Sequence, residues 1–86
     1  MPNTNANDTL SATMQTALIA AIRQYLQRNP HATDTAEGIT LFWLNELPLP
    51  PSAAQVADAL AALLASGEVE ALPLAGRTVW RRARAV

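Results

Sequence analysis

The apolar residues of the chain fall into three stripes of helical spacing, followed by two short alternating segments. The first stripe recurs every three or four residues and consists of Leu10, Met14, Leu18, Ile22 and Leu26. This spacing predicts one apolar face along a helix. Asn29 and Pro30 end it, because asparagine tolerates the left-handed position after a helix and proline cannot continue one. Residues 1–9 lack such periodicity, so we expect a disordered tail before a single domain over residues 10–86.

A second helix is predicted over residues 36–44, because the residues before it form a helix-start pattern. Asp34 can accept a hydrogen bond from the backbone amide of Glu37, and the Glu37 side chain can reach back, which is the arrangement of a capping box. Thr33 is the alternative cap. Capping explains these two carboxylates without any catalytic role.

Inside this helix, Ile39 and Trp43 lie one turn apart on the predicted buried face. Gly38 costs about 1 kcal/mol relative to alanine in a helix interior. We therefore expect another helix to approach closely there, with the Ala20–Ala21 surface of the first helix as the partner. Residues 45–51 then form an extended connection, since each proline fixes φ and biases the preceding residue away from helix.

A third helix begins at a second capping box, formed by Ser52 and Gln55. Its buried stripe consists of Val56, Leu60, Leu63 and Leu64. Ser66-Gly67 ends the helix. The alternating segments 68–72 and 77–81 then flank a glycine-containing turn, which is typical of a β-hairpin.

These elements predict a mainly α fold with a small β-hairpin: three helices followed by two antiparallel strands. The predicted core gathers the apolar positions of all four elements. It consists of Met14, Leu18, Ile22, Tyr25, Leu26, Ile39, Trp43, Val56, Leu60, Leu63, Leu64, Val69 and Trp80.

The junction at residues 60–69 carries leucines, then Ser-Gly-Glu-Val, and the chain ends in an aromatic–arginine pair, Trp80-Arg81. With the order of elements, this pattern resembles the winged helix-turn-helix class over residues 10–82. The resemblance implies a winged-helix fold with the hairpin as the wing, and a third helix that reads DNA in the major groove. The chain departs from the tight form, because six or seven Pro-rich residues join the second and third helices where three or four are usual.

Composition narrows the function classes. The chain has 86 residues, a formal net charge of −1, no cysteine and no lysine, which fits one small domain without disulfides or thiolate sites. No apolar run reaches the roughly 18 residues of a membrane span. Residues 1–9 also lack the positive start of a secretory signal. We therefore expect a bacterial, cytoplasmic protein.

The cations are concentrated at one end, since four of the six arginines lie in the last ten residues. The resemblance implies that Gln55 on the third helix reads adenine. It also implies that the wing arginines hold phosphates; these are Arg77, Arg81, Arg82 and Arg84. The alternative is a solvated strand face. The third helix carries Asp58 and no cation, which is a weak electrostatic footprint for DNA.

The outward positions of the third helix are mostly alanine, and several leucines lie in segments expected at the surface. The candidate protein-interaction surface comprises Leu47, Leu49, Ala54, Ala61, Ala62, Ala65, Leu72 and Leu74. A smooth apolar surface favours a protein partner or a second copy of the chain; the alternative is that the leucines cover the small core. We expect a non-catalytic adaptor or regulator, with a homodimer as its simplest form. A DNA-binding transcription regulator is the alternative.

The sequence gives little support for a catalytic function. His31 is the only histidine, and no second ligand or activated nucleophile accompanies it. We expect no cofactor, metal or small-molecule ligand. The stretch 47–51 could bind an aromatic groove as an extended ligand, but a stiff connection is the commoner reading. Trp43 and Trp80 could stack on bases, but their spacing favours the core.

Overall fold

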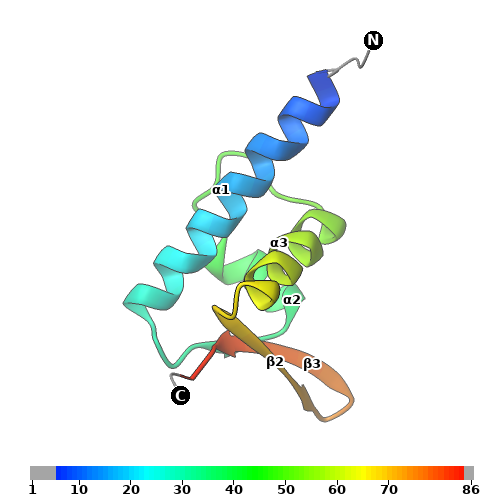
Figure 1. Cartoon of the computed structure of the whole chain (residues 1–86). Coiled ribbons are helices and arrows are strands. Elements are labelled where there is room, and N and C mark those ends of the chain that lie inside the picture. Colours follow the sequence, from blue (N-terminus) through cyan, green and yellow to red (C-terminus); the bar gives the residue numbers. More distant parts are fainter. Residues whose placement is uncertain (1–5, 85–86) are drawn as a thin grey trace.

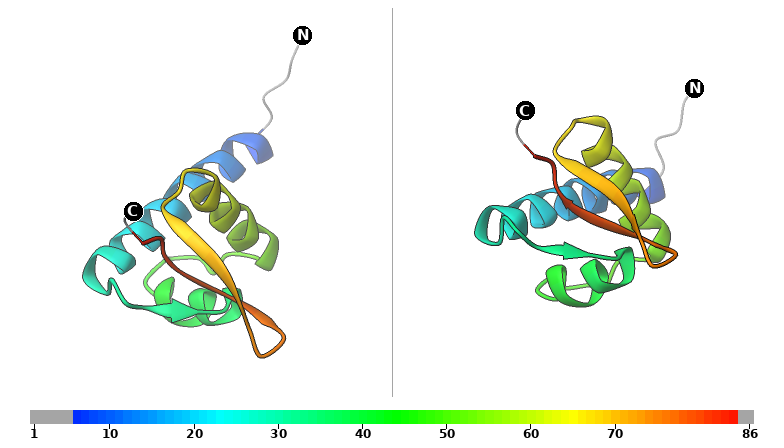
Figure 2. Two further views of the ribbon diagram at one scale, coloured as in Figure 1. Left: turned by 60° about the horizontal axis from the view of Figure 1, so that its bottom comes forward. Right: turned by 90° about the horizontal axis from the view of Figure 1, so that it is seen from below.

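A computed structural model describes the backbone of residues 6–84 and the side chains of residues 12–84. This part of the chain contains three helical segments and a three-stranded antiparallel sheet (Figure 1). The sheet lies at one end of the helices, below the C-terminal turns of α1 and α3 (Figures 1 and 2). The elements in chain order are α1 (Ala6–Arg28), β1 (Thr33–Asp34), α2 (Ala36–Gly38), η1 (Ile39–Trp43), α3 (Ala53–Ala65), β2 (Val69–Leu74) and β3 (Arg77–Arg82).

Helix α1 begins four residues before the start that the apolar stripe predicts. Residues 6–9 of the expected tail therefore belong to the helix, and residues 1–5 lie outside the described residues. The reason is that a helix is held by backbone hydrogen bonds, which continue beyond the stretch that packs on a core. The C-terminal end agrees with the prediction, because the Asn29 amide and side chain both donate to the carbonyl of Tyr25, at 2.8 and 3.1 Å.

The second helical segment starts at a different cap from either one predicted. Thr35 is the N-cap, and its hydroxyl oxygen accepts a hydrogen bond from the amide of Gly38 at 3.1 Å. Thr33 and Asp34 are unsuited to this role because they form strand β1. From Ile39 the helix widens to η1, in which the amide of Leu44 donates to the carbonyl of Ile39 at 3.1 Å.

The side chain closest to Gly38 belongs to Asp34 of β1, so the prediction that the α1 surface at Ala20–Ala21 requires this glycine is wrong. A β-carbon added at Gly38 would overlap the carboxylate of Asp34. One Asp34 oxygen accepts a hydrogen bond from the amide of Thr35 at 2.8 Å, which holds the carboxylate in place. The glycine makes room for a side chain four residues earlier.

Helix α3 begins as predicted, at the Ser52–Gln55 capping box, with both reciprocal hydrogen bonds present. Its buried residues are Val56, Ala59, Leu60 and Leu63. The prediction of Leu64 as core is wrong, because this side chain is 45% exposed. Ala59, on the other flank of the stripe, is buried instead, since the helix turns its 56, 59, 60 and 63 positions toward α1 and β2.

The sheet has three strands in the order β1-β3-β2, where the sequence predicts two. The third, β1, places Thr33 opposite Arg81 and Asp34 opposite Trp80. A strand of two residues has no alternating pattern, so periodicity cannot find it. The hairpin turn is Ala75–Gly76, and both residues have positive φ (51° and 79°), as the tight turns of twisted hairpins require.

The core is largely as predicted. Nine of the thirteen predicted residues are buried, while Met14, Tyr25 and Trp80 are half-buried and pack against them. The sequence misses Leu44, Ala59 and Val79. The rings of Tyr25 and Trp43 stack with centroids 4.7 Å apart and planes 11° apart, so these aromatics link α1 to η1 within the core.

Candidate interaction surfaces

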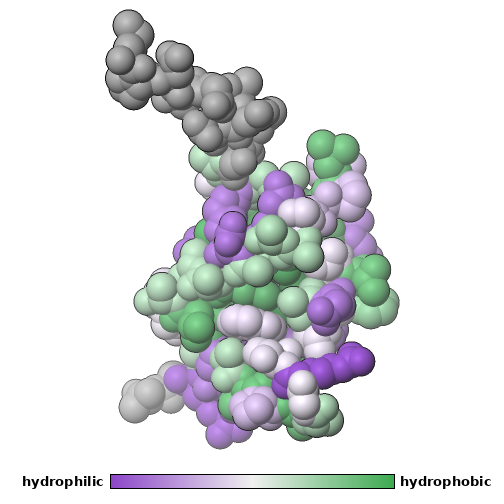
Figure 3. Space-filling model, turned by 90° about the vertical axis from the view of Figure 1, so that its right-hand side faces the viewer, coloured by the Kyte–Doolittle hydropathy of each residue, from purple (hydrophilic) through white to green (hydrophobic). Residues whose placement is uncertain are grey.

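One face of α3 is open and apolar. The helix packs on α1 and β2 through its buried side, and the other side carries a single charge, at Asp58. Figure 3 shows pale apolar surface across the middle of this face of the molecule. We name as the α3 apolar face its exposed apolar residues, which are Ala53, Ala54, Ala57, Ala61, Ala62, Leu64 and Ala65.

This face continues onto η1 through a residue that the sequence analysis overlooked. Leu41 is 66% exposed. It lines a shallow groove of about 310 Å³ together with Ala53 of α3, and Ala36, Glu37, Thr40 and Val56 form further walls. Its neighbour Phe42 is also exposed, at 64%. Four consecutive apolar residues at 41–44 are the signal that was available, because a short helix can bury only one side.

The four predicted surface leucines behave differently from one another. Leu49 and Leu74 are exposed. Leu47 is half-buried and packs against the core. For this residue, the alternative interpretation is confirmed: the leucine covers the core. Leu72 is half-buried and lies opposite buried Val79 in the sheet register, so the two side chains share the inward face of the sheet.

The five predicted nucleic-acid contacts do not all lie on one surface, because Gln55 and Arg77 are apart from the other three. The side-chain oxygen Oε1 of Gln55 accepts a hydrogen bond from the Ser52 amide at 2.8 Å, so this side chain is already used in the cap. Arg81 donates to Glu70 on β2 at 2.7 Å. Arg77 stands at the hairpin tip, and Arg82 ends the same strand, about 17 Å away at 3.4 Å per residue.

Three of these arginines, Arg81, Arg82 and Arg84, instead lie together beside the α1–β1 connection. Arg82 and Arg84 line a groove of about 700 Å³ with His31. The remaining walls are Pro30, Thr33, Gly67, Arg81 and Ala83. The contact arises because β1 pairs with β3, which places the residues before Thr33 alongside those after Arg81. Neither ion pair found among the described residues uses Arg82 or Arg84.

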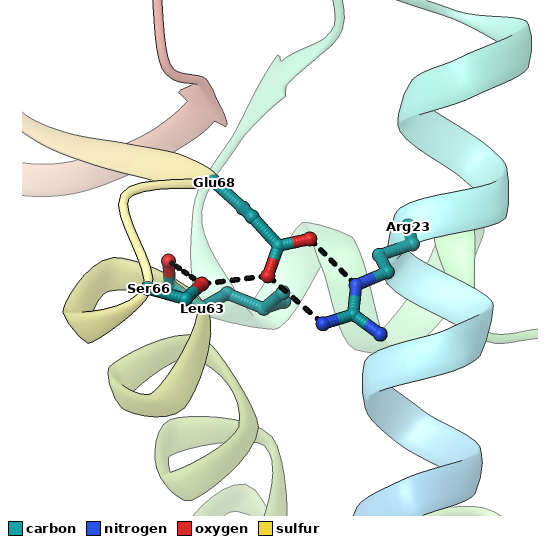
Figure 4. Close-up of polar contacts among 4 residues, drawn as sticks. All are labelled: Arg23, Leu63, Ser66 and Glu68. Carbon is teal, nitrogen blue, oxygen red and sulfur yellow. Dashed lines mark hydrogen bonds and ion pairs between the residues drawn. The ribbon is translucent and has the colours of Figure 1, made fainter.

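A separate polar cluster joins α1 to the start of β2 (Figure 4). The Arg23 guanidinium donates to both carboxylate oxygens of Glu68, at 2.6 and 2.9 Å. The Ser66 hydroxyl donates to Glu68 at 2.6 Å. The hydrogen bonds from Arg23 and then Ser66 lower the pKa of Glu68 from 4.5 to about 2. The sequence does not show this pair, because its members are 45 residues apart.

The Glu68 cluster predicts a specific acid sensitivity. Since the pKa of Glu68 is lower in the folded chain than in the unfolded one, its stabilisation is complete above about pH 4.5 and is lost as the pH falls toward 2. We expect Glu68→Gln to lower the thermal midpoint at pH 7 by a small amount, because both side chains are partly exposed. This difference should close between pH 4.5 and 2 in midpoints measured by circular dichroism. Glu46→Gln, at an exposed carboxylate, is the control; a pH-independent gap would contradict the assignment.

The remaining candidates have structural positions. Trp43 is buried, and Trp80 packs against the core. Within residues 6–84, no group of three His, Cys, Asp or Glu side chains could hold a metal ion. No helix in that range has the length and apolarity to cross a membrane.

Compared with known proteins, the chain matches no family model, no curated protein and no solved structure.

Proposed function

We propose that this chain is a small, non-catalytic winged-helix protein that acts as a protein-interaction adaptor or regulator. We further propose that it pairs with a second copy of itself through the α3 apolar face and Leu41. The order of three helical segments followed at once by a hairpin supports the class. Strand β1 joins the sheet beside β3 without changing that order.

The observation that carries this proposal is the character of the open side of α3. In the class that the chain resembles, this helix reads DNA. Here residues 53–65 contain no cation and one carboxylate, Asp58. A DNA-binding surface neutralises several phosphates. An apolar surface instead lowers its free energy when a partner removes it from water. Covering the exposed parts of Leu41 and Leu64 would contribute about 1–2 kcal/mol each.

A second copy is the partner that this face fits best. Small side chains let two helices pack at the short end of the usual 8–10 Å interaxial range. The proposed surface carries only two charges, Asp58 on α3 and Glu37 beside Leu41, so its repulsion of its own image is small. Two-fold pairs are also the commonest oligomers. Asp58 then has to lie off the two-fold axis, at the wet rim of the interface.

Light scattering on a sizing column tests the pairing. We expect the wild-type mass to rise toward twice 9.2 kDa with concentration. Ala61→Glu should keep it near 9.2 kDa, because the new carboxylate would be desolvated at the interface. The matched control is Ala17→Glu, which places the same charge at an exposed alanine of α1.

Two results would count against self-pairing. One is a wild-type chain that stays monomeric at every concentration. The other is equal disruption by both glutamates, which would point to charge or stability rather than to the α3 apolar face. At dilutions where the wild-type chain is monomeric, the thermal midpoints of both variants should stay near that of wild type, because surface substitutions change the free energy of unfolding by about 0.5 kcal/mol or less.

DNA binding is less well supported, because Gln55 serves the cap and Arg81 is held by Glu70. An anisotropy titration on random duplex at low and high salt is its test. Tight, strongly salt-dependent binding that is lost on removing Arg81 and Arg82 would favour it.

A further inference from the structure

The groove beside the C-terminal end of β3 is the most strongly cationic place among the described residues. Its lining includes Arg81, Arg82, Arg84 and His31, and contains no aspartate or glutamate. Three acids adjoin the lining. Glu68 and Glu70 are held by Arg23 and Arg81, and Asp34, next to Thr33, accepts a hydrogen bond from the amide of Thr35. Arg82 and Arg84 therefore present their guanidinium groups to solvent beside the imidazole of His31. We name this set the basic groove.

We infer that the basic groove binds an acidic peptide segment of another protein. A guanidinium offers parallel N–H donors that match the two oxygens of a carboxylate. Arg82 and Arg84 supply two such forks, and His31 supplies a further ring N–H donor to the same groove. The groove volume of about 700 Å³ suits a few side chains rather than a folded surface.

The charge distribution favours a short peptide over a nucleic acid. The two exposed arginines of the groove neutralise two charges, whereas duplex binding commonly engages 6–10 phosphates. The remaining exposed acids, among them Glu37, Glu46 and Asp58, would repel a long polyanion that extended past the groove. Arg77 cannot extend the patch, since it lies at the far end of β3.

This inference goes beyond the proposed function, because it uses a different surface. No residue of the basic groove belongs to the α3 apolar face. In Figure 1 the C-terminus and the end of α1, which flank the groove, lie at the lower left, whereas α3 lies in the right half of the molecule. The two surfaces can therefore be inactivated one at a time, and the failure of one proposal leaves the other standing.

Fluorescence anisotropy with a labelled Glu-Gly repeat peptide tests the inference. At low salt we expect saturable binding that weakens as salt is added, since exposed ion pairs are screened. The double variant Arg82→Gln/Arg84→Gln should bind about tenfold more weakly. The matched control Arg28→Gln/Arg77→Gln removes the same charge from exposed positions outside the groove, and should bind within about twofold of wild type.

The outcomes separate the possible sources of binding. Equal losses in the two double variants would overturn the inference in favour of net charge alone. Equal binding of a Gln-Gly peptide would overturn it as well, because no carboxylate would be needed. Tighter binding of a random duplex through Arg82 and Arg84 would assign the groove to nucleic acid. If the double variant does not fold, the single variant Arg84→Gln tests the same inference, because Arg84 lies beyond the end of β3. Its expected loss of peptide affinity is smaller.

Discussion

Leu60→Ala should destabilise the fold by about 2–5 kcal/mol, the largest effect that we expect from any single substitution here. Leu60 is fully buried in α3, within the cluster that joins α3 to α1, η1 and β2. The cost combines the lost burial of the side chain with the cavity left in a core that cannot close around it. A chain of this size buries only about 60% of its unfolded surface and is correspondingly marginal, so this loss should leave a measurable unfolded fraction at room temperature.

Urea unfolding followed by circular dichroism measures this effect, and Leu64→Ala is its matched control. The two leucines lie one turn apart on the same helix, but Leu64 is 45% exposed. We expect Leu64→Ala to cost about 1 kcal/mol or less, since most of its transfer free energy is not realised. Equal costs at the two positions would mean that α3 presents a different side to the core.

Gly38→Ala is expected to destabilise the chain by about 2–3 kcal/mol, although alanine is the better helix former by about 1 kcal/mol. The added methyl group would displace the carboxylate of Asp34. That displacement breaks the hydrogen bond that this carboxylate accepts from the amide of Thr35, and it strains the entry to α2.

A double-mutant cycle with Asp34→Ala identifies the cause. Once the carboxylate is absent, Gly38→Ala should become neutral or stabilising, because the helix propensity of alanine is then unopposed. The coupling free energy between the two positions should be about 2 kcal/mol or more. Additive costs in the cycle would show that something other than Asp34 excludes a side chain at this position.

The candidate surfaces were only partly predictable. The open alanines of α3 follow from periodicity, because once Val56 and Leu60 face inward the other side of the helix must face outward. Leu41 was missed, because the wide turn of η1 departs from the 3.6-residue spacing on which a helical reading depends. The basic groove was missed because it joins His31 to Arg84 across strand pairing.

The sequence by itself determined the local elements: three helical segments, the Ser52–Gln55 cap, the C-terminal hairpin and most of the core. These depend on interactions between residues a few positions apart, which spacing reports directly. Only the tertiary structure decided the third strand β1, the reason for Gly38, the Arg23–Glu68 pair and which side of α3 keeps Leu64 out of the core. Three of these four features depend on how distant elements meet. The Gly38 contact depends on the side-chain position that Asp34 takes once β1 is paired. The spacing of residues along the chain predicts neither of these.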